Sequence, residues 1–263
     1  DVNITVTFNE AVTLGGTSPT LSAVLETGTT DQTIALTTAD SGLTWTGTYT
    51  VQAGDTSSDL TVNTLVLGGT NPTLTDAAGN AATLTIAGGS NLANNETIVI
   101  DTTAPAAPSN AIDLSDGSDT GALNTDSITN DTTPTLRVDL TGTNAVAGDT
   151  VELLLGGSAL STPVTKVLDS TDISNTYVDL TVTDTDLGAD GDKVFTARVT
   201  DAAGNIGTAG GELTITLDTA APTAAVTSTT SDGAYKTGDD VNITVTFNEA
   251  VTLGGTSPTL SAV

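Results

Sequence analysis

The chain has 263 residues, of which 5 are basic and 32 acidic, and its formal net charge at pH 7 is -27. It contains no histidine, cysteine or methionine. Zinc sites, thiol nucleophiles, Ser-His-Asp triads and haem ligation are therefore excluded, because each needs an imidazole or a thiolate. The negative charge would repel nucleic acid and anionic lipid, so we expect neither nucleic-acid binding nor membrane insertion.

Apolar and polar side chains alternate along several short segments, which is the pattern of strands with one buried face. In chain order, the alternation predicts strands at residues 2–8, 43–51, 136–140, 194–199 and 213–217. Asp, Asn, Gly and Pro cluster between these runs as turn formers, and no stretch shows a helical period. We therefore predict an all-β chain of immunoglobulin-like β-sandwich modules with Greek-key connections and no disulfides; a closed barrel is the weaker alternative.

A repeat organises the whole chain. The 24-residue segment DVNITVTFNEAVTLGGTSPTLSAV occupies residues 1–24 and recurs unchanged at residues 240–263, an offset of 239 residues. Identical blocks at this spacing predict one full period of a tandem array and the opening of the next. Because the chain starts at Asp1 without an initiator Met or an apolar leader, we expect it to be an excerpt of a longer protein.

A looser repeat divides this period into modules. The motif TDAAGN occurs at residues 75–80 and 200–205, and the linkers IDTTAP and LDTAAP occupy residues 100–105 and 217–222. We expect three parts, each full module being of ordinary domain size. These are an N-terminally truncated module at residues 1–101, a complete module at 102–218, and the opening strands of a third at 219–263, which duplicate the first.

These motifs carry a family resemblance. The phrases DTTAP, TDAAGN, VTFNEAV, NTDSITNDTTPTL and GADGDKVFTARVTDAAGN resemble the bacterial immunoglobulin-like, cadherin-like repeats of giant RTX-type and biofilm-associated surface adhesins. The resemblance covers essentially the whole chain. It implies a structural extender, or stalk, on the bacterial cell surface that projects an adhesive tip for attachment or biofilm formation. It also implies that Ca²⁺ stiffens the joints between neighbouring modules of the array.

The acidic residues near the module ends are candidate Ca²⁺ ligands, because Ca²⁺ takes six to eight oxygen ligands from loops. Two Asp pairs with the same spacing, 119/126 and 232/239, are expected in the loop between the first two strands of their modules, at the end that carries the next linker. The predicted metal ligands are Glu10, Asp76, Asp101, Asp116, Asp119, Asp126, Asp201, Asp218, Asp232, Asp239 and Glu249. At the Asp218 junction, the available groups are Asp116, Asp119, Asp126, Asp218 and Glu249.

Other interpretations stay open. Each Asp can instead cap its own turn through its side chain, without a metal. Glycoside hydrolysis would use paired carboxylates but needs aromatic platforms. Only 3% of residues are aromatic, so we expect no enzyme, and we expect Trp45 and Tyr49 to lie in the core or on the surface of a strand and not to form a carbohydrate platform. The alternatives to a stalk are a subunit of an extracellular filament or sheath, in which edge strands pair, and a module that binds glycans or other cells.

Overall fold

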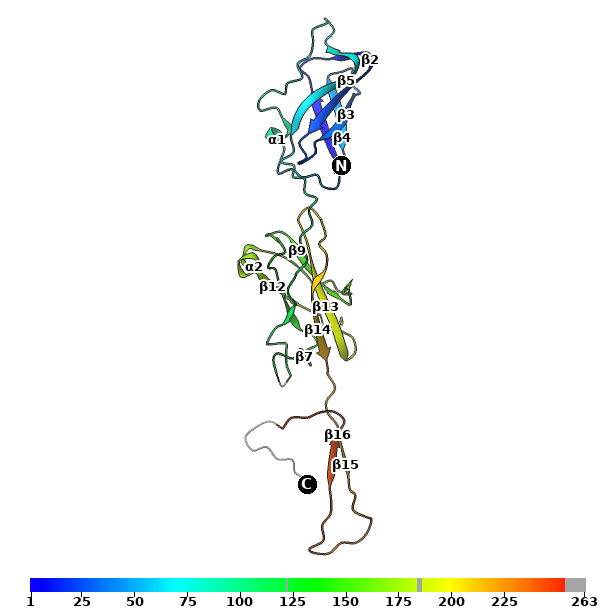
Figure 1. The fold of residues 1–263 in the computed structure, drawn as a ribbon, viewed down its shortest axis with the longest axis vertical. Helices are drawn as coiled ribbons and strands as arrows, with labels where there is room; N and C mark the ends of the chain where they lie inside the picture. Colours follow the sequence, from blue (N-terminus) through cyan, green and yellow to red (C-terminus); the bar gives the residue numbers. More distant parts are fainter. Residues whose placement is uncertain (122, 184–185, 254–263) are drawn as a thin grey trace. The chain divides into compact units, whose positions relative to one another are not determined.

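The computed structural model describes residues 1–121, 123–183 and 186–253. The chain divides into two compact units (Figure 1). The first unit comprises Asp1–Pro105 together with Thr200–Ile206, and the second comprises Ala106–Val199 with Gly207–Val263. The last ten residues, which belong to the predicted third module, lie outside the described residues.

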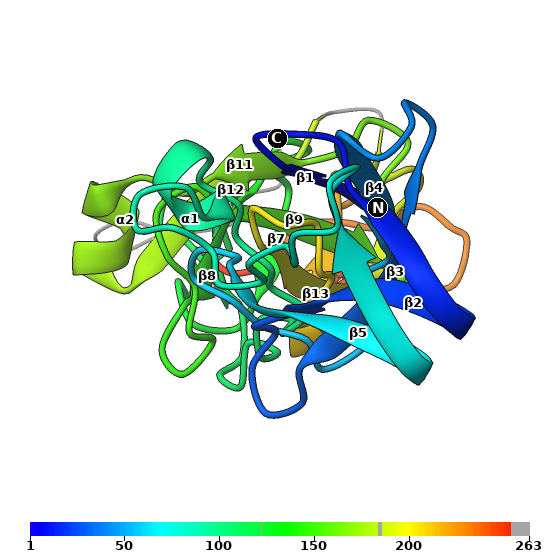
Figure 2. The ribbon, with the colours of Figure 1, turned by 90° about the horizontal axis from the view of Figure 1, so that it is seen from above.

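Five strands and one short helix form the first unit. Their bounds are β1 (Val2–Thr7), β2 (Thr13–Leu25), β3 (Gln32–Thr38), β4 (Thr44–Tyr49), β5 (Val62–Thr75) and α1 (Leu92–Asn95). The strand order is β1-β4-β3-β2-β5, and the pairs are antiparallel. The strand β3 pairs with β2 over most of its length and with β4 at Thr37 and Thr38, so it connects the two parts of the sheet. Strands β2 and β5 run side by side in both views (Figures 1 and 2).

The core of the first unit follows the predicted alternation. Ile4 of β1 is buried, and so are Trp45 and Tyr49 of β4. The indole Nε1 of Trp45 donates to the Gly42 carbonyl at 3.0 Å, so its polar atom is satisfied inside the core. Of the two places expected for Trp45 and Tyr49, the core and the strand surface, the structure shows the core.

Two sheets of the second unit form a sandwich. The elements of this sandwich are β6 (Asp113–Leu114), β7 (Ile128–Thr129), β8 (Thr135–Asp139), β9 (Thr150–Leu155), β10 (Ser158–Ala159), β11 (Thr165–Val167), α2 (Ser170–Asn175), β12 (Tyr177–Thr181), β13 (Gly191–Thr200) and β14 (Gly210–Leu217). One sheet has the order β12-β8-β6, and the other has the order β10-β9-β13-β14-β7, with β11 also paired to β9. The pair β14–β7 is parallel, whereas β10–β9, β11–β9, β13–β14, β12–β8 and β6–β8 are antiparallel.

A single core lies between these sheets. Leu136 and Val138 of β8 and Phe195 and Ala197 of β13 are all fully buried and belong to one cluster. Side chains from the two sheets therefore face each other, as in a β-sandwich of immunoglobulin type. The predicted all-β, immunoglobulin-like fold is confirmed, and the closed barrel is not the fold of this unit.

Two features of the second unit differ from the sequence prediction. The helix α2 was not predicted, because its six residues are too few for a helical period to be visible. It forms because Asp169 and Asp172 make a capping box at its start. In addition, residues 119–126 were expected between the first two strands of their module. They lie between β6 and β7, where the chain crosses from one sheet to the other, and the two-residue strand β7 was not predicted.

The last described elements are the antiparallel strands β15 (Ala224–Thr227) and β16 (Thr244–Phe247), which form a separate two-stranded sheet (Figure 1). Val226 and Val245 are 66% and 37% exposed there. Among the described residues, no helix has the length and apolar character needed to cross a membrane.

Candidate functional site

Three predicted ligands, Asp119, Asp126 and Asp218, lie toward the same end of the second sandwich, where β14 stops. The Asp218 N–H donates to the Thr129 carbonyl at 2.9 Å, and the Thr129 hydroxyl donates to the Ser118 carbonyl. Asp119 follows Ser118 directly, so these bonds bring the segment before β7 close to the start of the linker. Asp126, just before β7, lies at the same end because β7 pairs with the last residues of β14.

Asp119 is the predicted ligand with the least ordinary surroundings. It is only 5% exposed. Its Oδ2 accepts a hydrogen bond from the Ser127 N–H at 3.2 Å, but its Oδ1 is buried and has no hydrogen-bond partner. A buried carboxylate oxygen without a donor is costly unless a cation or another group satisfies it. Asp119 thus has one carboxylate oxygen in a turn bond and one without a donor.

Glu249 has a similar orphaned oxygen. It follows β16, whose last residue is adjacent to Asn248. The Asn248 N–H donates to the Thr223 carbonyl at 3.1 Å, and the Thr223 N–H donates to the Asn248 Oδ1 at 2.6 Å. These bonds place Glu249 beside the linker that starts at Asp218. The Oε1 of Glu249 is buried and has no hydrogen-bond partner.

Three other predicted ligands take part in turns. Asp101, Asp126 and Asp218 each accept, through Oδ1, a hydrogen bond from the backbone N–H two residues further on, at 2.8–3.1 Å. This is the geometry of an Asx turn, which the alternative interpretation of these residues predicts. The turn occupies Oδ1 in each of these three residues.

The two TDAAGN motifs form the same closed loop. The carboxylate of Asp76 accepts from the Asn80 amide at 2.7 Å, and that of Asp201 accepts from the Asn205 amide at 2.8 Å. The Asn80 bonds hold the pKa of Asp76 below its ordinary value. Burial raises the pKa of Asp201, but its hydrogen bonds from Asn205 and from backbone N–H groups outweigh burial, so this pKa is also lowered. In the first unit, the Asn205 amide also donates to the Asp101 carbonyl at 3.0 Å.

Asp239 belongs to a turn that occurs three times in the chain. Asp55, Asp149 and Asp239 each follow a glycine with φ between +93° and +103°. Each carboxylate accepts from the backbone N–H three residues earlier at 2.9 Å. The repetition shows that this Gly-Asp pair is a way of closing a turn. Asp149 also has a buried Oδ1 without a partner.

The remaining predicted ligands are exposed in loops. Asp116 precedes Gly117 in the turn after β6, and Asp232 lies between β15 and β16. Glu10 lies between β1 and β2. Because Thr13 pairs with Thr75, the loop with Glu10 and the loop with Asp76 lie at the same end of the first unit.

No three acidic residues among the described parts of the chain converge closely enough to hold a metal ion. The predicted ligand set therefore stays a prediction. One neighbour of the Asp218 linker escaped the sequence analysis: Asp190, just before β13, accepts a hydrogen bond from the Thr219 hydroxyl at 2.8 Å.

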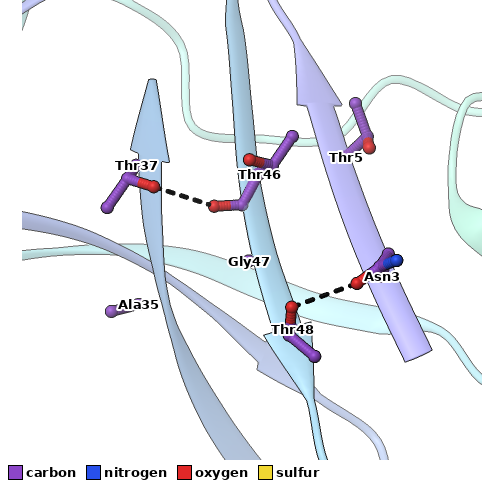
Figure 3. Close-up of a pocket in the computed structure, with 7 residues that line it drawn as sticks. All are labelled: Asn3, Thr5, Ala35, Thr37, Thr46, Gly47 and Thr48. Atoms are coloured by element: carbon purple, nitrogen blue, oxygen red, sulfur yellow. Dashed lines mark hydrogen bonds between the residues drawn. The ribbon is translucent and has the colours of Figure 1, made fainter. Parts of the chain in front are cut away.

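A shallow hollow of about 570 Å³ lies on the exposed face of β1, β4 and β3 (Figure 3). Its seven lining residues are Asn3, Thr5, Ala35, Thr37, Thr46, Gly47 and Thr48. None of these residues is acidic or aromatic. The hollow therefore provides neither carboxylates for a cation nor a ring on which a sugar would stack.

The fold of the second unit places it among the immunoglobulin-like β-sandwiches, and a comparison with known families agrees. Residues 106–219 match the model of the bacterial Ig-like domain. The resemblance to bacterial immunoglobulin-like repeats is confirmed.

Among solved structures, the chain is similar to one described as "Ca2+-stabilized adhesin helps an Antarctic bacterium reach out and bind ice". The identity is 21% and the TM-score 0.35, over 84% of this chain and 52% of that chain. The chain thus spans about half the length of that protein chain. A comparison with curated proteins gave no match.

Proposed function

We propose that these modules form the stalk of a bacterial surface adhesin, in which Ca²⁺ stiffens the joints and an adhesive region elsewhere makes the attachment. The observation that carries the proposal is the tandem repeat: a bacterial Ig-like domain lies between two identical 24-residue segments. Modules in tandem contact only their neighbours, and a stalk needs no catalytic site. The same reasoning supports an extracellular location on the cell surface.

Two of the three orphaned carboxylate oxygens among the described residues support a role for calcium. Asp119 and Glu249 lie on either side of the Asp218 linker in the sequence, and each has a buried oxygen without a donor. When bound, Ca²⁺ supplies positive charge and accepts several oxygen ligands with flexible geometry. We propose that Asp119, Asp218 and Glu249 hold the ion, together with Asp116 and Asp126 from the same end of the sandwich.

The charge of the chain gives this ion a mechanical role. A net charge of -27 makes neighbouring acidic loops repel each other. A cation that is shared between the end of one module and the start of the next cancels part of this repulsion and restricts bending at the linker. Asp119 and Glu249 would do so from opposite sides of residues 218–223.

Thermal unfolding of the whole chain in Ca²⁺, Mg²⁺ or chelator tests the calcium role. If Ca²⁺ binds only the folded form at 100 times its Kd, it adds about 2.7 kcal/mol, or about 10 °C in Tm. We expect Asp119→Asn to abolish this gain. In chelator, the same variant should be at least as stable as the parent, because it removes an unpaired buried charge.

Asp131→Asn is the matched control. Asp131 lies in the same region, but its Oδ1 already accepts the Thr133 N–H at 2.8 Å, and it is not a predicted ligand. This variant should retain the full Ca²⁺ response. A Ca²⁺ response that survives Asp119→Asn, or no response in the parent, would rule out calcium at this joint.

The stalk itself is tested by small-angle X-ray scattering of the chain. We expect the scattering in Ca²⁺ to fit one stiff arrangement with a single maximum dimension. Once chelator is added, we expect the scattering to show bending at the linker. Identical profiles in both conditions would contradict a stalk that Ca²⁺ stiffens.

A module that binds glycans is the less favoured alternative, since the hollow in Figure 3 has no aromatic lining residue. A glycan-array signal that Ca²⁺ does not affect would favour it.

A further inference from the structure

The second TDAAGN loop, which joins β13 to β14, contacts the linker that precedes its own sandwich. The side-chain amide of Asn205 donates to the backbone carbonyl of Asp101 at 3.0 Å, although the two residues are 104 positions apart. Residues Thr200–Ile206 belong to the same compact unit as this linker, whereas β14 and nearly all of β13 belong to the other unit. The loop is thus part of the surroundings of the linker, although its sequence belongs to the second sandwich.

The closed geometry of this loop fixes the Asn205 amide. The Asp201 carboxylate accepts the Asn205 backbone N–H through Oδ1 and the Asn205 side-chain amide through Oδ2, each at 2.8 Å. The Asp201 N–H donates to the Asn205 carbonyl, and the Gly204 N–H donates to the Asp201 carbonyl, both at 3.1 Å. An asparagine side chain has two N–H donors. Asp201 therefore holds one of them, and the other is left for the linker.

The first unit holds the same stretch of linker through other bonds. The Thr102 hydroxyl donates to the Asp55 carbonyl at 2.9 Å and accepts from the Gly54 N–H at 3.1 Å. Asp101 accepts the Thr103 N–H through its own Oδ1 at 2.8 Å. The TDAAGN loop therefore binds a segment that these bonds already hold in one conformation.

The first TDAAGN loop has the same internal geometry. Asp76 accepts the Asn80 backbone N–H at 2.8 Å and the Asn80 side-chain amide at 2.7 Å. Within residues 1–121, 123–183 and 186–253, no linker carbonyl accepts from this amide. Closure of the loop and binding of a linker are therefore separate properties, and this copy provides a matched control.

We propose that the TDAAGN loop of the second sandwich is a latch for the linker, in which Asn205 binds the linker backbone and Asp201 positions Asn205. The bond goes to a main-chain carbonyl, so it requires no particular side chain in the linker. It needs no metal ion, because the contacts with Asn205 and the linker are direct hydrogen bonds. The latch closes only once the chain has folded as far as residue 205, so that a finished domain holds the linker at its own start.

Hydrogen exchange of the whole chain in chelator, resolved to single amides by NMR, tests the latch. We expect Asn205→Ala to speed exchange of the Thr103 N–H about threefold to tenfold, which is the effect of one ordinary hydrogen bond. The Val138 N–H in β8 reports on the fold of the second sandwich, and its rate should change less. The control Asn80→Ala opens the equivalent loop of the first unit and should leave the Thr103 rate unchanged.

Asp201→Asn separates a positioning carboxylate from a metal ligand. This variant places an NH₂ group opposite the Asn205 amide, so the amide must turn and then presents its oxygen to the Asp101 carbonyl. We expect the Thr103 rate in chelator to rise as much as in Asn205→Ala. A residue that only binds a metal predicts no rise in chelator, because the variant then removes an uncompensated charge.

The swapped pair, Asp201→Asn with Asn205→Asp, isolates the bond to the linker. It closes the loop again with donor and acceptor exchanged, but it has no side-chain donor at residue 205 for the Asp101 carbonyl. We expect the Val138 rate to return to that of the parent and the Thr103 rate to stay raised.

Three results would each overturn the latch. These are a Thr103 rate that none of the variants changes, an equal rise for Thr103 and Val138, and recovery of the Thr103 rate in the swapped pair. An Asn80→Ala variant that speeds Thr103 exchange as much as Asn205→Ala would also overturn it. All of these measurements are made without Ca²⁺, so they are distinguishable from a failure of the calcium proposal.

Discussion

Removal of the Asp55 carboxylate should severely destabilise the first unit. Asp55 is 4% exposed. It accepts the Tyr49 hydroxyl at 2.7 Å, the Gln52 N–H at 2.9 Å and the Gln32 amide at 3.0 Å. In Asp55→Ala, the Tyr49 hydroxyl becomes a buried donor without an acceptor, which costs about 1–3 kcal/mol, and two charge-assisted bonds are lost as well. We expect a loss of about 3–5 kcal/mol in the free energy of unfolding.

Urea unfolding followed by Trp45 fluorescence measures this loss in the first unit alone, because Trp45 is the only tryptophan and is buried there. In a double-mutant cycle, Tyr49→Phe should recover about 1–2 kcal/mol in the Asp55→Ala background, since it removes the orphaned hydroxyl. Asp31→Ala is the control. Asp31 is an exposed carboxylate of the same unit that accepts only the amide of Asn63 in a side-chain contact, and its loss should cost about 0.5 kcal/mol or less.

The pH dependence gives the sign of the Asp55 contribution. Burial raises the pKa of Asp55, but the hydrogen bonds from Tyr49, Gln52 and Gln32 outweigh burial and lower it. A carboxyl group with a lowered folded-state pKa stabilises the fold above its unfolded value of about 3.9 and loses that contribution as the pH falls through the folded value. The difference between parent and Asp55→Ala should thus be constant from pH 7 to about 5 and shrink below about 4. A constant difference down to pH 2, or a loss below about 1 kcal/mol at pH 7, would refute this account of the buried carboxylate.

Two further substitutions probe backbone strain and the independence of the units. Gly42→Ala should cost at least about 3 kcal/mol, because its Cβ would lie 1.9 Å from the Val12 carbonyl oxygen at φ +100°, whereas Gly54→Ala, at φ +93° with nothing within 4 Å, should cost only about 1 kcal/mol. Equal urea midpoints for the two variants would contradict this comparison. Leu136→Ala should destabilise the second unit by about 2–5 kcal/mol in calorimetry and leave the Trp45 transition unchanged. A shifted Trp45 midpoint would mean that the two units unfold together.

The strands were predictable because burial of one face leaves a period of two in the sequence. Leu136, Val138 and Leu140 are all buried, as their alternation indicates. The two-residue strand β7 and the six-residue helix α2 carry no period, since they are shorter than the repeats that would reveal them. Their formation depends instead on local pairing with β14 and on the Asp169 cap.

The candidate site was only partly predictable, because aspartates in similar turns have different surroundings. Asp119 and Asp126 read alike in the sequence, yet Asp119 is buried with an orphaned oxygen and Asp126 is an exposed turn cap. Likewise, Asp55 and Asp239 close the same turn, but only Asp55 has a tyrosine hydroxyl beside it. Burial and partners of this kind come from segments distant in the chain, which turn composition does not encode.

The two copies of the repeated segment show how an adjacent segment changes the same residue. Glu10 and Glu249 occupy the same position of an identical sequence, yet Glu10 is exposed and Glu249 has a buried Oε1. Beside Glu249, the Asn248 N–H donates to the Thr223 carbonyl, and residues 224–227 pair with β16. The surroundings of Glu249 therefore come from the linker before it and not from its own segment. The linker that would carry Ca²⁺ and the strand that pairs with the repeated segment are one continuous stretch, residues 218–227.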